Sequence, residues 1–161
     1  MQEKIGASPL VVNNKPILDG LAKGIEEAGN EYLKNNRDSI TRLDKKIAYQ
    51  PNCASRWLPE QDAWLRDIFE LIGVERLSRQ YQGTDALCCS GPIIRTNREL
   101  AIKIQTDNVK DAIDSRADAL ITMCPVCDAV MRRPTSQLGI PKIFITDLCR
   151  IALGEIGWPA R

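Results

Sequence analysis

Residues 118–127 read DALITMCPVC, a short apolar run that ends in two cysteines separated by two residues. The run Ala119–Met123 is uncharged and has the length of a buried β-strand. Pro125 is typical of the first turn of a helix, where its missing N–H costs nothing. A strand that runs directly into a helix is the repeating unit of α/β folds. The stretch therefore predicts an α/β domain with Cys124 and Cys127 at a strand–helix junction.

The same alternation of short apolar runs and longer amphipathic segments extends in both directions, from Lys46 to the end of the chain. The further strands that we expect are Lys46–Gln50, Arg76–Gln82, which is the weakest, and Lys142–Ile145. The further helices that we expect are Glu60–Gly73, a helix opened by residues 124–127, and Asp147–Leu153. This order predicts an open, mostly parallel sheet flanked by helices.

A long helix is expected after the paired cysteines, because apolar residues recur there with a period of 3.6. We expect it to span about six turns. The residues of its apolar stripe are Ile94, Ala101, Ile102, Val109, Ala112 and Ile113. Gly91-Pro92 and Pro125 are expected at helix starts, so that two sets of free backbone N–H groups would face one anionic ligand.

Residues 1–45 have a different composition, in which glycine and asparagine interrupt every helical stretch. Helix is supported there only in pieces such as Ile17–Lys34. The chain has 161 residues, of which 43% are hydrophobic, and this suffices for one globular domain with a sizeable core. We therefore expect an N-terminal helical extension over residues 1–45 and a single cysteine-rich domain over residues 46–161.

The charge balance argues against several classes of partner. The 22 Lys and Arg residues nearly match the 21 Asp and Glu residues, and no basic run is present to follow a phosphate backbone. No window of about 18 uncharged apolar residues occurs, and residues 1–10 lack the apolar core of a signal peptide. We expect a cytoplasmic protein that does not bind nucleic acid and that reaches a membrane only through partner subunits. In that reducing compartment, clustered cysteines bind metal or perform redox chemistry rather than form structural disulfides.

Five of the six cysteines follow the pattern C-x34-C-C-x34-C-x2-C. These are Cys53, Cys88, Cys89, Cys124 and Cys127. Each lies at an expected strand end or helix start, and such positions converge beyond the carboxyl edge of an open parallel sheet. Cys149 lies outside the pattern and is interpreted as a small buried hydrophobic residue.

Three kinds of site remain open at this point. A structural zinc site needs four Cys or His ligands, and the chain has no His, so a zinc site would be all-cysteine. Five thiols exceed a tetrahedral set, and the adjacent Cys88 and Cys89 do not easily face one small ion, so an iron–sulfur cluster is favoured over zinc. Cys124 and Cys127 alone also match a thiol–disulfide motif at a helix N-terminus, but that interpretation leaves Cys53 unexplained.

The pattern resembles the cysteine-rich CCG domain family, and in particular the C-terminal half of the CCG-containing subunit of heterodisulfide reductase. The matching stretches are residues 49–53 (YQPNC), 87–92 (LCCSGP), 118–127 (DALITMCPVC) and the closing segment 143–147 (IFITD). One difference is that the family's glycine after the cysteine pair is Ser90 here, followed by Gly91. Another is that the reductase subunit carries two such motifs and this chain carries one.

The resemblance implies an α/β fold and a noncubane [4Fe–4S] cluster. Its five ligands would be Cys53, Cys88, Cys89, Cys124 and Cys127, and we expect Cys88 and Cys89 to be catalytic. The implied function is an iron–sulfur oxidoreductase subunit that reduces or forms a small disulfide. The implied partners are a ferredoxin-like iron–sulfur subunit, a flavoprotein subunit and a second CCG-containing chain. Zinc, with a role in assembly of a larger complex, is the alternative.

Overall fold

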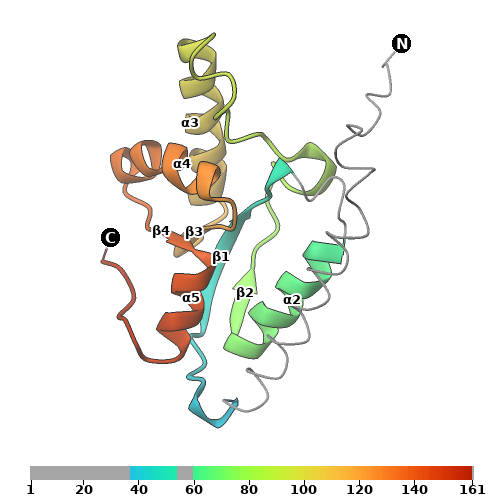
Figure 1. Cartoon of the computed structure of the whole chain (residues 1–161), viewed down its shortest axis with the longest axis vertical. Helices are drawn as coiled ribbons and strands as arrows, with labels where there is room; N and C mark the ends of the chain where they lie inside the picture. The colour runs from blue at the N-terminus through green and yellow to red at the C-terminus, as the bar shows by residue number, and fades with distance from the viewer. Residues whose placement is uncertain (1–36, 54–59, 161) are drawn as a thin grey trace. The chain divides into compact units, whose positions relative to one another are not determined.

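The computed structural model describes residues 37–53 and 60–160 (Figure 1). Ile40–Arg161 forms one compact unit. Residues 41–44, placed in the expected extension, belong to this unit and are bonded within it from Thr41 N to Ala152 O and from Leu43 N to Ile72 O. A short 3-10 turn, η1, spans Arg37–Ser39. The expected helix Ile17–Lys34 lies outside the described residues.

A four-stranded parallel sheet forms the centre of this unit, in the order β2-β1-β3-β4. The strands are β1 (Lys45–Gln50), β2 (Val74–Arg76), β3 (Ala119–Thr122) and β4 (Lys142–Phe144). The four residues Ile47–Gln50 and all four residues of β3 are buried, as expected for inner strands covered on both faces. The predicted α/β class with an open parallel sheet is confirmed.

Four α-helices cover the two faces of the sheet (Figure 1). They are α2 (Glu60–Ile72), α3 (Arg98–Asp114), α4 (Pro125–Leu138) and α5 (Ile145–Ala152). On one face, Leu65 of α2 and Leu148 of α5 pack with Ile47. On the other face, Val109 of α3 and Met131 of α4 pack with Leu120. The result is a three-layer arrangement with a separate core on each side of the sheet.

The connections leave β1 and β3 in opposite directions, which creates a crevice between them. From β1 the chain crosses through α2 to β2, whereas from β3 it crosses through α4 to β4 on the far side. Gln50 and Thr122 are partners in the β1–β3 register, so both strands end at the same level. In open α/β sheets such a switch point is where ligands bind.

The second strand lies earlier in the chain than the sequence predicts. It covers Val74–Arg76 instead of Arg76–Gln82, and Leu77 adds one further bond from its N–H to Ile47 O. Beyond that point the N–H groups of Gln80 and Tyr81 donate to the Asp111 carboxylate, at 3.1 and 3.0 Å. A side chain of α3 therefore takes the donors that a longer strand would have used.

The long helix α3 is shorter and rotated relative to the prediction. It begins at Arg98, after an Asn97 side chain that caps its first turn, and Ile94 lies before it. Ile102 and Ile113 are exposed, although both belong to the predicted apolar stripe. The buried positions are Ala101, Gln105, Asn108, Val109 and Ala112. Two amide side chains, those of Gln105 and Asn108, therefore lie on the buried side of the helix.

None of the helices in the described ranges combines the length and the apolar character needed to cross a lipid bilayer.

Candidate metal centre

Three segments bring the five patterned cysteines to the switch point. Cys53 follows β1, and Cys88 and Cys89 lie between a 3-10 turn, η3 (Gly83–Asp85), and α3. Cys124 is the N-cap residue of α4, and Cys127 lies in the first turn of that helix. The crossover connections of a parallel sheet return each of these segments to the same edge, which accounts for the separations of 34 residues in the sequence.

The five cysteine side chains form a series in which each one contacts the next. The Sγ atoms of Cys53 and Cys88 are 4.0 Å apart. Cys89 interacts with the side chains of both Cys88 and Cys127, and Cys127 interacts in turn with Cys124. The order is therefore Cys53, Cys88, Cys89, Cys127, Cys124, and the adjacent pair links the two halves of the series.

The series is buried in the middle and open at one end. Cys89 and Cys127 are 3% and 2% exposed and belong to the core between the sheet and α3 and α4. Cys53 is exposed, and Cys88 and Cys124 are partly buried. A small cavity of about 80 Å³ lies beside Cys53 and Cys88 and is lined mainly by apolar atoms of residues such as Leu87. A small molecule could therefore approach the Cys53–Cys88 end of the series.

Cys89 and Cys127 form a hydrogen-bonded pair in which the two thiols differ in acidity. The hydrogen bond from Cys127 lowers the pKa of Cys89, and the same bond raises the pKa of Cys127, with burial adding to the second effect. A thiol–disulfide motif would use only Cys124 and Cys127 and would leave Cys89, to which Cys127 is hydrogen-bonded, without a role.

Backbone N–H groups face the sulfurs of the adjacent pair. Ser90 N donates to Cys88 Sγ at 3.3 Å, and the backbone N–H of Gly91 interacts with Cys89. Ser90 has φ of +62° and is 1% exposed, so its backbone is in the left-handed region that favours glycine. Successive N–H groups around such a residue form a concave site for anions.

The expectation of two helix N-termini at this site is half wrong. Pro125 does open α4, beside Cys124. Gly91-Pro92, in contrast, lies in a series of turns over residues 91–96, and α3 begins only at Arg98. The turn at Ser90 replaces the second helix as the source of N–H groups.

Gly91 allows the two cysteine motifs to come close together. A Cβ atom added at Gly91 would lie 2.8 Å from Cγ1 of Val126 and 3.7 Å from Sγ of Cys89. Carbon atoms in proteins pack at about 3.5–4.0 Å, so a side chain at this position would require the Val126 side chain to move aside. The Cys88–Cys89 segment therefore packs directly on the turn that contains Cys124 and Cys127.

Sequence reasoning missed a group of buried polar residues behind the thiols. Gln50 Nε2 donates to Leu87 O at 2.9 Å, and Gln105 Nε2 donates to Cys89 O at 3.0 Å. Asn108 Nδ2 donates to Gln50 Oε1 at 2.5 Å. The buried residues follow one another in the order Ala101, Gln105, Asn108 and Ala112. Successive members are four, three and four positions apart, which is the spacing of a buried helix stripe. That placement of amides on an otherwise small-residue stripe is the signal that could have identified them.

An acidic residue fixes the start of α4. Asp128, next to Cys127, accepts hydrogen bonds from the Thr122 hydroxyl at 2.9 Å and from the Lys142 ammonium group. Thr122 ends β3 and Lys142 begins β4, so one carboxylate connects α4 to two neighbouring strands. The CxxC turn is thereby held against the carboxyl edge of the sheet.

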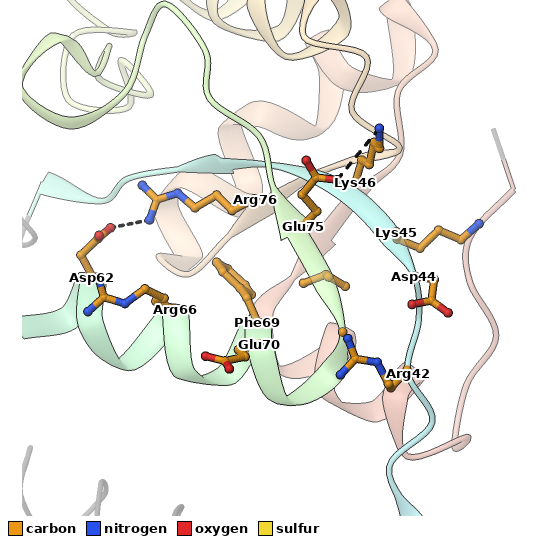
Figure 2. Close-up of a pocket in the computed structure, with 12 residues that line it drawn as sticks. Arg42, Asp44, Lys45, Lys46, Asp62, Arg66, Phe69, Glu70, Glu75 and Arg76 are labelled. Carbon is orange, nitrogen blue, oxygen red and sulfur yellow. Dashed lines mark hydrogen bonds and ion pairs between the residues drawn. The ribbon is translucent and has the colours of Figure 1, made fainter.

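A larger cavity, of which the described ranges form the lining, lies elsewhere. It measures about 720 Å³ and is lined by α2, β2 and the amino-terminal part of β1, including Lys45 and Lys46 (Figure 2). The thiols follow the opposite end of β1. Several charged residues that line this cavity form ion pairs with one another. Arg76 Nη1 lies 2.5 Å from Asp62 Oδ1, and Lys46 Nζ lies 4.0 Å from Glu75 Oε2. We therefore place the metal centre at the thiols and not in this cavity.

The donor set is consistent with a metal cluster. Five soft thiols arranged in series, with N–H donors directed at two of them, match the ligands of iron–sulfur clusters.

The cysteine-rich domain family, CCG, matches the chain over residues 47–132, which is more than half of its length. The chain belongs to this family. The matched range contains all five cysteines of the series. A search of curated proteins found no match. A CCG domain whose thiols cluster at one edge of a parallel sheet is consistent with a metal-cluster redox domain.

Proposed function

We propose that this CCG domain is the iron–sulfur redox subunit of a complex that resembles heterodisulfide reductase. The observation that carries the proposal is the series of five thiols at the switch point, with Cys89 and Cys127 almost fully buried. Soft thiolates bind iron in clusters, and adjacent cysteines can reach different irons of one cluster. The proposed cofactor is a noncubane [4Fe–4S] cluster held by Cys53, Cys88, Cys89, Cys124 and Cys127.

The cluster, when bound, would supply one-electron transfer to or from the sulfur of a small disulfide or thiol. The residues of the chain provide the setting for that chemistry. Cys88 and Cys89 are the proposed catalytic residues, and the small cavity beside Cys53 and Cys88 is the proposed substrate side. Burial of Cys127 keeps water from the opposite side of the pair. The N–H groups of Ser90 and Gly91 offset negative charge on sulfur, which is a determinant of cluster potential.

The proposed partners follow from the same function. A ferredoxin-like iron–sulfur subunit would deliver electrons one at a time, and a flavoprotein subunit would supply them to it. A second CCG-containing chain would complete the two-motif arrangement. The proposed location is the cytoplasm, with membrane association only through such partners.

The first prediction concerns metal content. Anaerobic reconstitution with iron and sulfide should give about four irons and four sulfides per chain, the content of a [4Fe–4S] cluster. Serine at Cys89 should remove most of this iron, because a buried ligand is lost. Colorimetric iron and sulfide analysis, with EPR of the oxidised protein, provides the measurement.

The matched control is Cys149→Ala. Cys149 lies on α5, which packs on the opposite face of the sheet from the thiols, so this variant should retain full iron content. Fewer than about two irons per wild-type chain would contradict the cluster assignment. Stoichiometric zinc in protein purified anaerobically, with no iron uptake, would support the zinc alternative.

Turnover separates a catalytic cluster from a structural one. With reduced viologen as electron donor and a small aromatic disulfide as substrate, Cys88→Ser should abolish reduction if the centre is catalytic. Activity that persists in this variant would assign the metal a role in folding or assembly. Activity that survives complete removal of metal would instead favour thiol–disulfide exchange by Cys124 and Cys127.

A further inference from the structure

Two buried amides hold the backbone on either side of the adjacent cysteines. Gln50 donates to Leu87 O at 2.9 Å, immediately before Cys88, and Gln105 donates to Cys89 O at 3.0 Å. Gln50 is 0% and Gln105 is 4% exposed, so water does not compete for these carbonyls. Both peptide groups that flank the cysteine pair are therefore fixed by side chains from outside the segment.

The bond from Gln105 has a consequence on the other side of the peptide group. Cys89 O and Ser90 N belong to one planar trans peptide unit, in which C=O and N–H point in opposite directions. The structure contains no cis peptide bond in the described residues. When Gln105 Nε2 fixes the direction of Cys89 O, the Ser90 N–H is therefore directed away from Gln105. Its acceptor is Cys88 Sγ, at 3.3 Å.

The Ser90 backbone is left-handed, so the orientation of the Cys89–Ser90 peptide depends on contacts that hold it in place. A non-glycine residue at φ of +62° is strained by roughly 1–2 kcal/mol relative to the right-handed region. The Ser90 hydroxyl gives little help, because its distance to Cys88 O is 3.5 Å. Rotation of the Cys89–Ser90 peptide would relieve strain at Ser90 and break the bond to Cys88 sulfur. The Gln105 amide opposes that rotation.

Gln50 is held by its own chain of contacts. Asn108 Nδ2 donates to Gln50 Oε1, and Arg79 donates to Asn108 Oδ1 at 2.8 Å. Asn108 and Gln105 lie three residues apart on α3, on its buried side. One helix thus controls the peptide groups both before Cys88 and after Cys89.

We propose that Gln105 is a positioning residue of the metal centre, which acts through the Cys89–Ser90 peptide to aim the Ser90 N–H at Cys88 sulfur. The inference rests on the proposed function for its redox consequence, but not for the backbone geometry. A donor to sulfur stabilises the more negative, reduced state of a bound cluster. Loss of the Gln105 amide therefore lowers the cluster potential and leaves its ligands in place.

Gln105→Met tests this inference, because methionine keeps the length of the side chain and removes the amide. In the reconstituted protein, the expected results are unchanged iron content, an altered EPR signal and a midpoint potential shifted to more negative values. In the metal-free protein, the Ser90 amide should exchange with solvent up to about tenfold faster, the effect of losing one hydrogen bond. NMR of labelled protein measures that exchange rate.

Gln137→Met is the matched control, since Gln137 is exposed on α4 and should leave all four measurements unchanged. Gln105→Asn is a second variant, which keeps an amide but shortens its reach, and should show the same shifts. An unchanged potential together with unchanged Ser90 exchange in folded Gln105→Met would overturn the inference. Unfolding of both Gln105 variants, seen by circular dichroism, would make Gln105 a purely structural residue and would also overturn it.

The two proposals fail in different ways. If the wild-type protein takes up no iron, the proposed function is wrong, and the Ser90 exchange rate in metal-free protein still decides whether Gln105 positions the peptide. If the cluster forms in the wild-type protein, and the Gln105 variants have the midpoint potential and the Ser90 exchange rate of wild type, the proposed function stands and the positioning role is wrong.

Discussion

Two neighbouring residues after the cysteine pair meet different steric demands. Ser90 adopts a left-handed φ, the conformation for which glycine is suited, yet it carries a Cβ atom. Gly91 has no such backbone angle, but its missing side chain is what lets Val126 approach. The chain therefore accepts backbone strain at Ser90 and has a glycine at the position where space is needed.

The second prediction follows from the contact at Gly91. Alanine at Gly91 should destabilise the fold by about 1 kcal/mol, because its Cβ overlaps Cγ1 of Val126 and this half-exposed side chain must move aside. The iron content after reconstitution should fall as well if the movement changes the distance between the two cysteine motifs. Urea unfolding and iron analysis provide the measurements.

Gly157→Ala is the control for this variant. A Cβ at Gly157 would meet no atom within 4 Å, so stability and iron content should match those of wild type. Full cluster content in Gly91→Ala would show that the close approach of the two motifs is dispensable.

Individual cysteines were easier to predict than the residues that orient them. Thiols are rare, and their regular spacing points to one site, so Cys53 and Cys127 stood out in the sequence. Gln105 did not, because an amide on a helix is most often exposed and only the fold reveals its bond to Cys89 O. The sequence also suggested a buried Cys149; that residue is partly buried, and burial raises its pKa.

At the scale of elements, α3 acts as a support for the segment that carries Cys88 and Cys89. Arg79, from the irregular stretch after β2, contacts Asp111 of α3 at 3.2 Å and donates to Tyr49 O of β1 at 2.9 Å. Its side chain is 1% exposed, so this ion pair is shielded from solvent. The stretch lacks regular secondary structure and is fixed by these bonds instead.

The third prediction tests that role. Arg79→Met should destabilise the protein by about 3–5 kcal/mol, because it leaves Asp111 without its buried cation and breaks the bond to Asn108. Chemical denaturation followed by circular dichroism gives the free energy of unfolding. Lys103→Met is the control on the same helix, because Lys103 pairs with Asp107 at the surface and its loss should change little. Equal effects of the two variants would argue against a structural role for the Arg79 network.

The same network explains why β2 and α3 were predicted poorly. Residues 77–82 have the composition of a strand, but Asp111 captures the N–H groups of Gln80 and Tyr81. The period of apolar residues placed Ile102 on the buried side of α3, while the helix buries Gln105 and Asn108. In both places a polar contact between distant parts of the chain overrides the local sequence pattern. The partner in such a contact cannot be identified from the local sequence. Strands β1, β3 and β4 and helices α2, α4 and α5 lie within a few residues of their predicted ranges.

On the scale of the whole molecule, the two cores on either side of the sheet have different characters. The core with α3 and α4 contains the thiols, whereas the core with α2 and α5 contains Tyr49. The Tyr49 ring packs edge-on against Phe69, with the two ring centroids 6.2 Å apart. Burial raises the pKa of Tyr49 to about 12, and the nearby Arg76 only partly opposes this effect.

The fourth prediction is the dependence of stability on alkaline pH. The pKa of Tyr49 is higher in the folded state than its usual value of 10.0, so its contribution is constant below pH 10.0 and is lost as pH rises toward 12. A difference of about two pKa units corresponds to a loss of about 3 kcal/mol. Tyr49→Phe should remove this loss and leave stability near neutral pH almost unchanged. Denaturant unfolding across the alkaline range measures the difference.

The partly exposed Tyr81 provides the comparison for Tyr49. Tyr81→Phe should keep the alkaline decline of the wild-type protein. A Tyr49→Phe variant that declines as steeply as wild type would assign the alkaline sensitivity to other groups.

The order of the strands also has a consequence for the biogenesis of the centre. β1 pairs with β3 across a long stretch of chain that includes α2, β2 and α3, and the thiols meet only when this pairing is made. During synthesis Cys53 leaves the ribosome well before Cys124, and nonlocal pairings of this kind form late in folding. A partly made chain therefore presents isolated thiols rather than a cluster site. Under the proposed function, cofactor insertion would therefore follow completion of the sheet.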